Sequence, residues 1–260
     1  MTEQQFFVAA VPVFLAAFLG FALGLFTDWL KTRRENRKLS RERQEKELTQ
    51  LNGAASAVVY NIEILLHIVM QQILPHREQS HAAAAALHAV ENNATELRAF
   101  SKSMHSEFKY MMTRCPEPYF VELEFFKEIP FVLAKDPELL KRSGWMVSYT
   151  RTLKEILSER NKRIDMNVGT AMDLDFEALE EQIRIQAHIG DTEVINSLML
   201  FEQFQAIRKK LEKIAEGYKN VFGAHLNIVL PEQQLDSTLR DLRRIAEEVV
   251  PEFPPPDPES

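Results

Sequence analysis

The sequence predicts an all-α protein: one N-terminal transmembrane helix that continues into a charged helical stalk and an irregular cytoplasmic helical bundle. Residues 6–26 contain no charged, amide or hydroxyl side chain. The chain has only eight glycines, and five of its twelve prolines lie in the last ten residues, so few positions in between must interrupt a helix. Beyond the stalk, apolar residues recur at spacings of three and four, which indicates helices with one buried face.

The apolar run of residues 6–26 predicts a signal-anchor helix over residues 6–29, after a short extracytoplasmic tail of residues 1–5. Its twenty-one residues make about 31 Å of helix, which matches a hydrocarbon core of roughly 30 Å. A cleaved signal peptide fits less well, because the leader MTEQQ carries no positive charge and the run exceeds the usual apolar core of about 7 to 15 residues. A buried core helix fits less well too, because the run is apolar all round.

Positive charge on the C-terminal side of this run predicts its orientation. Residues 27–50 carry eight Lys and Arg against five Asp and Glu, whereas Glu3 is the only charged residue on the N-terminal side. Because basic loops stay in the cytoplasm, we expect an inner or plasma membrane protein with its N-terminus outside. A plain stop-transfer flank is favoured over specific attraction to anionic lipid. The expected anchors at the bilayer interface are Trp29, Lys31, Arg33 and Arg34.

Three small residues recur every four positions in the span: Ala16, Gly20 and Gly24. They fall on one stripe of a helix, where a second backbone can approach closely. Glycine and alanine are also common in spanning helices that do not associate. The stripe is therefore interpreted at even odds as the contact of a homo-oligomer or as part of a spanning helix that does not associate.

Residues 30–50 alternate charges with few leucines, which predicts a solvated helical stalk. Residues 51–250 then form the predicted cytoplasmic domain, and the proline-rich residues 251–260 form a disordered tail. The first helix of the domain has a seam of about three heptads that ends before Pro75. Either a bundle or a coiled coil with a second copy would cover this seam, and later amphipathic segments favour the bundle. The seam residues are Leu51, Ala55, Val58, Ile62, Leu65 and Val69.

Further helices are predicted from the same periodicity. Asp136 and Pro137 have the pattern of an N-cap followed by proline in the first turn. Asn167 and Gly169 suggest a loop at residues 166–170, and Gly190 with Asp191 suggests a break in the helix after it. The expected helices span residues 77–112, 136–163, 173–218 and 232–249, with a short aromatic turn or helix at 119–127.

No recognised catalytic, metal or cofactor motif occurs in the chain. Cys115 is the only cysteine, so no intrachain disulfide can form and the chain suits a reducing compartment. We interpret His81 and His88 as exposed polar residues in preference to a metal site. We interpret Glu63 and His67 as a structural pair in preference to a catalytic one. Residues 51–260 carry a net charge of −9, which argues against nucleic acid as a partner.

Two sets of residues have a structural and a binding interpretation. Asn61, Asn161 and Asn196 lie among apolar residues, where fixing the packing of helices is favoured over binding a ligand. Tyr119, Phe120, Phe125 and Phe126 form an aromatic patch, for which burial in the core is favoured over docking of a protein partner.

The leading hypothesis is a non-enzymatic adaptor or scaffold of the membrane, which binds the lipid bilayer and either itself or an unidentified protein. The first alternative is an oligomeric membrane effector or channel subunit, although the span offers no polar residue to line water. The second is an enzyme whose helical active site has no familiar pattern.

Overall fold

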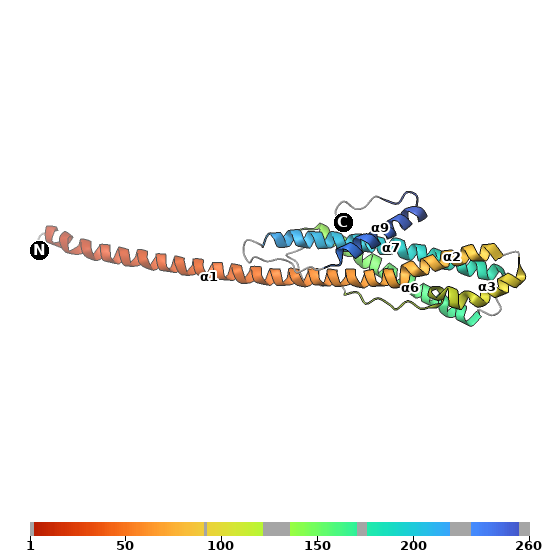
Figure 1. Cartoon of the computed structure of the whole chain (residues 1–260). Helices are drawn as coiled ribbons and strands as arrows, with labels where there is room; N and C mark the ends of the chain where they lie inside the picture. The colour runs from red at the N-terminus through yellow and green to blue at the C-terminus, as the bar shows by residue number, and fades with distance from the viewer. Residues whose placement is uncertain (1–2, 91–92, 122–135, 171–175, 219–229, 255–260) are drawn as a thin grey trace. The chain divides into compact units, whose positions relative to one another are not determined.

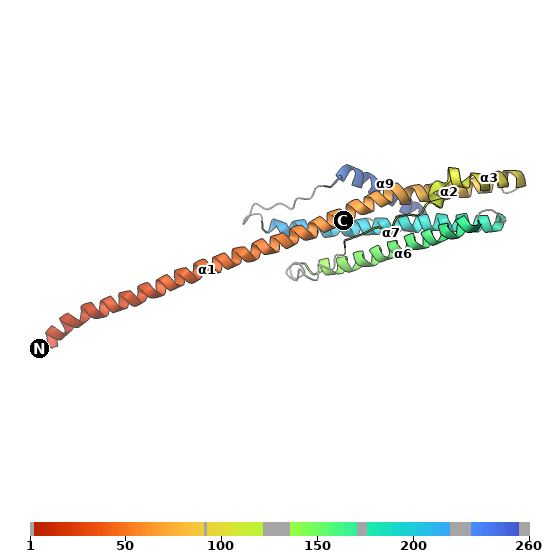
Figure 2. The ribbon, with the colours of Figure 1, turned by 90° about the horizontal axis from the view of Figure 1, so that it is seen from below.

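The computed structural model describes residues 3–90, 93–121, 136–170, 176–218 and 230–254. The chain divides into two compact units, Met1–Thr49 and Gln50–Ser260, and each is treated by itself. Within the described residues all regular structure is helical, which confirms the predicted all-α class (Figures 1 and 2). The helices are α1 Glu3–Ile68, the π-helix η1 Val69–Ile73, α2 Leu74–Val90, α3 Ala94–Glu107, α4 Lys109–Met112, α6 Glu138–Thr170, α7 Phe176–Glu216 and α9 Glu232–Val249.

The first unit consists of the N-terminal part of α1. The side chains of residues 20–29 are exposed, apolar ones included, and those of residues 31–43 are exposed as well. Between Gly20 and Val90 the helical chain also contains a window that is long and apolar enough to cross a membrane by length and composition, with a mean hydropathy of 1.6, and half of that window is buried. The structure therefore has one long apolar N-terminal helix, as the sequence predicts.

The second unit is built around α7, which packs against α2, α6 and α9. A helix in the centre of a bundle must be apolar on several faces. The middle of α7 meets this requirement, because nearly every residue from Glu193 to Ile207 is buried or half-buried. The predicted apolar stripe of this helix is confirmed as core: Val194, Leu198, Phe201, Phe204, Ile207 and Leu211 are all buried.

The predicted seam on the first helix of the bundle is also confirmed as buried, from Leu51 to Val69. The helix itself does not end with the seam before Pro75, because the helical path continues through η1 into α2. Proline has no N–H to bond the carbonyl four residues earlier, and its ring clashes with that carbonyl. A π-turn accommodates the proline: Leu74 donates its N–H to the carbonyl of Val69, five residues earlier.

Three other predicted boundaries are corrected. The helix expected at 77–112 is divided into α2, α3 and α4, and Asn93 caps α3 by accepting hydrogen bonds from the N–H groups of Thr95 and Glu96. The loop expected at 166–170 is the last part of α6. No break occurs at Gly190, since α7 runs through it.

Gly190 has a packing role in place of the expected break. A Cβ at this position would lie 2.9 Å from the Cα of Arg77 on α2, so only glycine lets the two helices approach this closely. By contrast, the helix predicted at 232–249 is confirmed at both ends by α9. The predictions for residues 122–135, which include most of the aromatic turn, lie outside the described residues.

Candidate functional site

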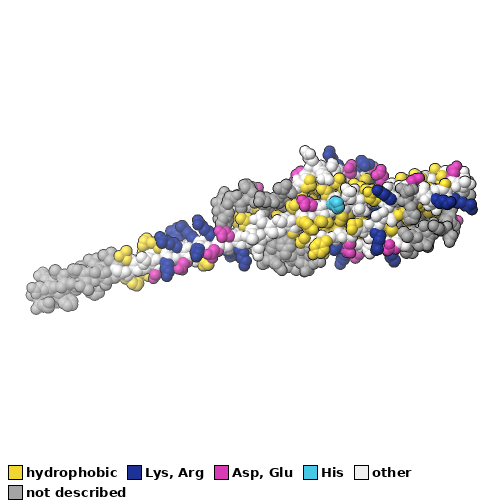
Figure 3. Space-filling view, turned by 60° about the horizontal axis from the view of Figure 1, so that its bottom comes forward, with side chains coloured by type: hydrophobic (Ala, Val, Ile, Leu, Met, Phe, Trp, Pro, Cys, Tyr) yellow, Lys and Arg dark blue, Asp and Glu magenta, His cyan; other side chains and the backbone are white. Residues whose placement is uncertain are grey.

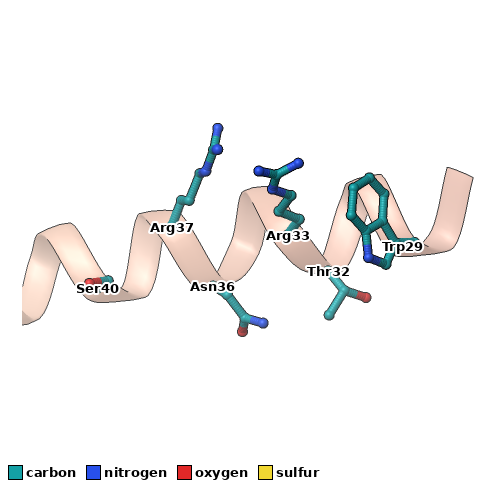
Figure 4. Close-up of a pocket in the computed structure, with 6 residues that line it drawn as sticks. All are labelled: Trp29, Thr32, Arg33, Asn36, Arg37 and Ser40. Atoms are coloured by element: carbon teal, nitrogen blue, oxygen red, sulfur yellow. The ribbon is translucent and has the colours of Figure 1, made fainter. Parts of the chain in front are cut away.

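An accessible cluster of aromatic and charged side chains lies on α1. Trp29 is 53 % exposed, its ring stacks on Phe26 with centroids 5.9 Å apart, and the guanidinium carbon of Arg33 lies 5.0 Å from the Trp29 centroid. Arg33 and Arg37 extend to the side of the helix on which the Trp29 ring lies (Figure 4). We call this surface the basic face; it is lined by Trp29, Thr32, Arg33, Asn36, Arg37 and Ser40.

Arg33 and Arg37 make no ion pair with any described residue, and the sequence explains why. Side chains pair along a helix at distances of three and four residues, and no Asp or Glu stands at those distances from either arginine. Cations further along the helix do find partners: Lys38 pairs with Glu42 at 3.8 Å and Arg43 with Glu47 at 3.0 Å. Figure 3 shows many Lys and Arg side chains on this part of the helix.

The bundle contains a second polar cluster, which is fully enclosed. His76 on α2 lies with Nδ1 3.1 Å from Glu193 Oε2 and Nε2 2.9 Å from Gln186 Oε1, both on α7. Arg160 on α6 places Nη1 3.6 Å from the same Glu193 oxygen, and its Nη2 donates to the carbonyl of Tyr110 at 3.0 Å. We call His76, Arg160, Gln186 and Glu193 the buried polar network.

All four side chains of the buried polar network are at most 1 % exposed. Several of their polar atoms have no hydrogen-bond partner among the described residues, namely Arg160 Nε and Nη1, Gln186 Nε2 and Glu193 Oε1. Buried groups of this kind are usually satisfied by internal water. The network links α2, α6 and α7 through charges that would be costly to leave alone, so it specifies how these helices pack.

A third feature is the extended chain at residues 113–121, which two asparagine side chains hold. The amide of Asn161 on α6 accepts from the Cys115 N–H and donates to the Cys115 carbonyl, both at 2.8 Å. The amide of Asn61 on α1 likewise accepts from the Val121 N–H at 2.8 Å and donates to the Val121 carbonyl at 3.0 Å. Each amide thus satisfies both backbone groups of one residue outside regular structure. Asn196 similarly donates to the carbonyl of Tyr149 at 2.9 Å.

Cys115 lies on this extended chain and is only 2 % exposed. Burial raises the pKa of its thiol from 9.0 to about 11, an effect that nearby Arg160 partly offsets and Glu193 reinforces. The thiolate, which is the reactive form, is therefore scarce at neutral pH. This environment is that of a structural cysteine.

The predicted aromatic patch is divided between surface and core. Tyr119 is 76 % exposed, whereas Phe120 is buried and its ring lies 6.4 Å from that of Phe204. Phe125 and Phe126 lie outside the described residues. Of the expected docking aromatics that the structure describes, only Tyr119 is accessible.

The other candidate residues are not brought together. Glu63 and His67 are both exposed, and His81 lies 3.0 Å from Asp191. No group of three His, Cys, Asp or Glu side chains suited to a metal occurs among the described residues. In the proposed small-residue stripe, Gly20 and Gly24 face open space, and the side chain of Ala16 is outside the described set.

Sequence reasoning missed the buried polar network. A signal was present, because Gln186, Glu193 and Ser197 share one side of a long amphipathic helix. Comparison with models of protein families, with curated proteins and with solved structures finds no match to this chain. The function is therefore argued from the residues themselves.

Proposed function

We propose that the chain is a single-pass, membrane-anchored helical adaptor or scaffold, with its N-terminus outside and its bundle on the cytoplasmic face. The observation that carries this proposal is the exposure of large apolar side chains on successive turns of α1, directly before the basic residues. They are Phe21, Leu23, Leu25, Phe26 and Trp29, each more than half exposed.

Exposed apolar area of this extent is unfavourable in water, at about 25 cal/mol per Å². Because these side chains point in several directions around the helix, a single partner helix would leave part of them in water. Lipid covers all sides at once. Half of the most apolar window between Gly20 and Val90 is buried, as in a core helix, so the proposal depends on residues 20–29 rather than on hydropathy alone.

The polar groups of the bundle support an adaptor more than an enzyme. The buried polar network is closed to solvent, and the side-chain amides of Asn61 and Asn161 form hydrogen bonds with the protein's own backbone. Cys115 is held as a neutral thiol by burial, which raises its pKa to about 11. These groups stabilise the packing of the helices. Recognition of a second copy or of another protein would then take place on the outer surface of the bundle.

Extraction of membranes with alkaline carbonate tests the anchor. The full chain should remain in the membrane pellet. A Phe21→Asp, Leu23→Asp variant should be released, because a carboxylate in the hydrocarbon core costs roughly 3 kcal/mol. The matched control Thr32→Asp, Asn36→Asp adds the same charge in the stalk and should stay in the pellet. Release of the unaltered chain would contradict the proposal.

Light scattering in mild detergent tests self-association. An oligomeric full chain beside a monomeric chain that begins at Leu30 would assign assembly to the span, and Gly20→Ile should then dissociate it. One shared oligomeric state would assign assembly to the bundle. Two monomers would contradict self-association and leave a different protein as the partner of the adaptor.

A further inference from the structure

We propose that the basic face of α1 binds the phosphate of anionic phospholipid headgroups, with Arg33 and Arg37 as ligands and Trp29 as the interfacial anchor. This inference rests on the proposed membrane anchor and adds a preference for lipid charge. Its evidence is the arrangement of charges on this helix, the contact between Arg33 and Trp29, and the lack of ion pairs at both arginines.

The charge arrangement leaves Arg33 and Arg37 in need of an external anion. The two arginines are four residues apart, so they are neighbours of like charge on one side of the helix, which is unfavourable by a few tenths of a kcal/mol. The nearest acidic residues, Asp28, Glu35 and Glu42, are spaced by seven. Seven residues make nearly two whole turns, so these three acids share one stripe of the helix. This stripe lies on the side away from Arg33 and Arg37. These acids are too far from Arg33 and Arg37 to offset the repulsion between the two arginines, whereas a bound phosphate would offset it.

Trp29 gives the basic face a position and an orientation. Tryptophan favours the boundary between headgroups and acyl chains, since its ring is apolar and its N–H is polar. The Arg33 guanidinium lies 5.0 Å from the Trp29 centroid, a cation–π distance that keeps it beside this boundary. A guanidinium presents a planar fork of donors that matches two oxygens of a phosphate.

Neutral side chains border the basic face, and Figure 4 shows Thr32 and Asn36 extending away from Arg33 and Arg37. Thr32, Asn36 and Ser40 line the basic face together with the arginines and are exposed. Their hydroxyl and amide groups can donate further hydrogen bonds to phosphate or glycerol oxygens. The face contains no carboxylate, so a phosphatidylcholine headgroup gains nothing from its choline cation there, whereas phosphatidylglycerol presents a net negative charge.

Lys38 and Arg43 provide an internal contrast. They lie on the same helix, but each already pairs with a glutamate. A phosphate would have to compete with those carboxylates. The inference therefore predicts that headgroup preference depends on Arg33 and Arg37 more than on an equal number of other cations nearby.

Quenching of Trp29 fluorescence by brominated lipids measures this preference. The chain has two tryptophans, so Trp145→Phe leaves Trp29 as the only reporter in the full-length protein. It is reconstituted into vesicles of phosphatidylcholine and phosphatidylglycerol at 7:3, with bromine on the acyl chains of one lipid or the other. We expect an association constant about fivefold higher for phosphatidylglycerol, the effect of roughly one basic residue near the surface.

Matched variants assign the preference to the basic face. Arg33→Gln, Arg37→Gln should bring the ratio of association constants close to one, and Lys38→Gln, Arg43→Gln should retain more than half of the preference. A ratio of one in the unaltered basic face, or equal losses in the two variants, would overturn the inference while leaving the anchor intact. No quenching by either brominated lipid would overturn the anchor as well.

Discussion

Two stretches of α1 differ in what covers their side chains. Residues 20–43 present both apolar and charged side chains to the surroundings, whereas residues 51–68 bury a regular seam that includes Leu51, Val58 and Ile62. The first stretch is apolar and then rich in charge, and the second buries most of its apolar side chains, with Tyr60 as an exposed exception. A helix at the edge of a bundle needs apolar side chains on one face only. The apolar side chains of residues 20–29 are exposed on several sides of the helix, which suits the proposed contact with lipid.

The buried polar network gives the largest expected effect on the stability of the bundle. Glu193→Ala leaves Arg160 and His76 buried without their carboxylate, which should reduce the free energy of unfolding by about 3–5 kcal/mol. Urea unfolding in mild detergent, followed by Trp145 fluorescence in a Trp29→Phe background, reports on the bundle. Replacing three of its four members together, with His76→Leu, Arg160→Met and Glu193→Leu, should cost much less. A larger loss in this triple variant would argue against charge burial as the cause.

The same substitution should lower the stability of the bundle strongly at a buried position and hardly at all at an exposed one. Phe204 is fully buried and contacts Phe120, so Phe204→Ala should lower the free energy of unfolding by about 3–4 kcal/mol. Phe21 is 66 % exposed, and Phe21→Ala should change bundle unfolding by less than about 0.5 kcal/mol. Both are measured by the Trp145 signal. A comparable loss from Phe21→Ala would show that residues 20–29 pack on the bundle.

Asn161 and Cys115 test how the extended chain at 113–121 is held. Asn161→Ala removes two hydrogen bonds to the Cys115 backbone, which should cost about 2 kcal/mol. It should also speed labelling of Cys115 by a thiol reagent at pH 8 severalfold, because the thiol becomes accessible. Asn196→Ala removes a hydrogen bond to α6 instead and is the control that should leave labelling slow. Fast labelling of the unaltered chain would contradict this arrangement.

Cys115 also predicts a dependence of stability on alkaline pH. Burial raises the pKa of the folded thiol from 9.0 to about 11. As pH rises, the thiol of the unfolded chain therefore loses its proton before the thiol of the folded chain does. The contribution of the protonated Cys115 thiol to stability is complete below pH 9 and is lost as pH rises towards 11. Cys115→Ser should flatten the fall in unfolding free energy over this range. An unchanged slope would assign the fall to other groups.

The smallest effects concern two glycines within the bundle. At Gly190 a methyl group would meet the Arg77 backbone, so Gly190→Ala should cost about 1 kcal/mol after the gain in helix propensity. At Gly144 on α6 a Cβ would have no neighbour within 4 Å, so Gly144→Ala should stabilise by roughly 0.5–1 kcal/mol. Thermal unfolding distinguishes the signs. A stabilising Gly190→Ala would contradict the close approach of α2 and α7.

The periodic parts of the fold were predictable from the sequence. The seam from Leu51 to Val69 and the whole of α9 follow from apolar residues at helical spacing. The π-turn before Pro75 was not, because proline alone does not say whether a helix ends or adjusts. The contacts of His76 and Asn161 depend on residues more than forty positions away, and neither spacing nor propensity contains such pairings.

The position of Trp29 relative to lipid tests whether the N-terminal part of α1 is anchored in a membrane. Two single-tryptophan forms of the full chain, Trp145→Phe and Trp29→Phe, are reconstituted into vesicles and exposed to brominated lipid or to aqueous iodide. We expect Trp29 to be quenched by the lipid and shielded from iodide, while Trp145 shows the reverse. Trp29 quenched by iodide as strongly as Trp145, with no effect of brominated lipid, would contradict it.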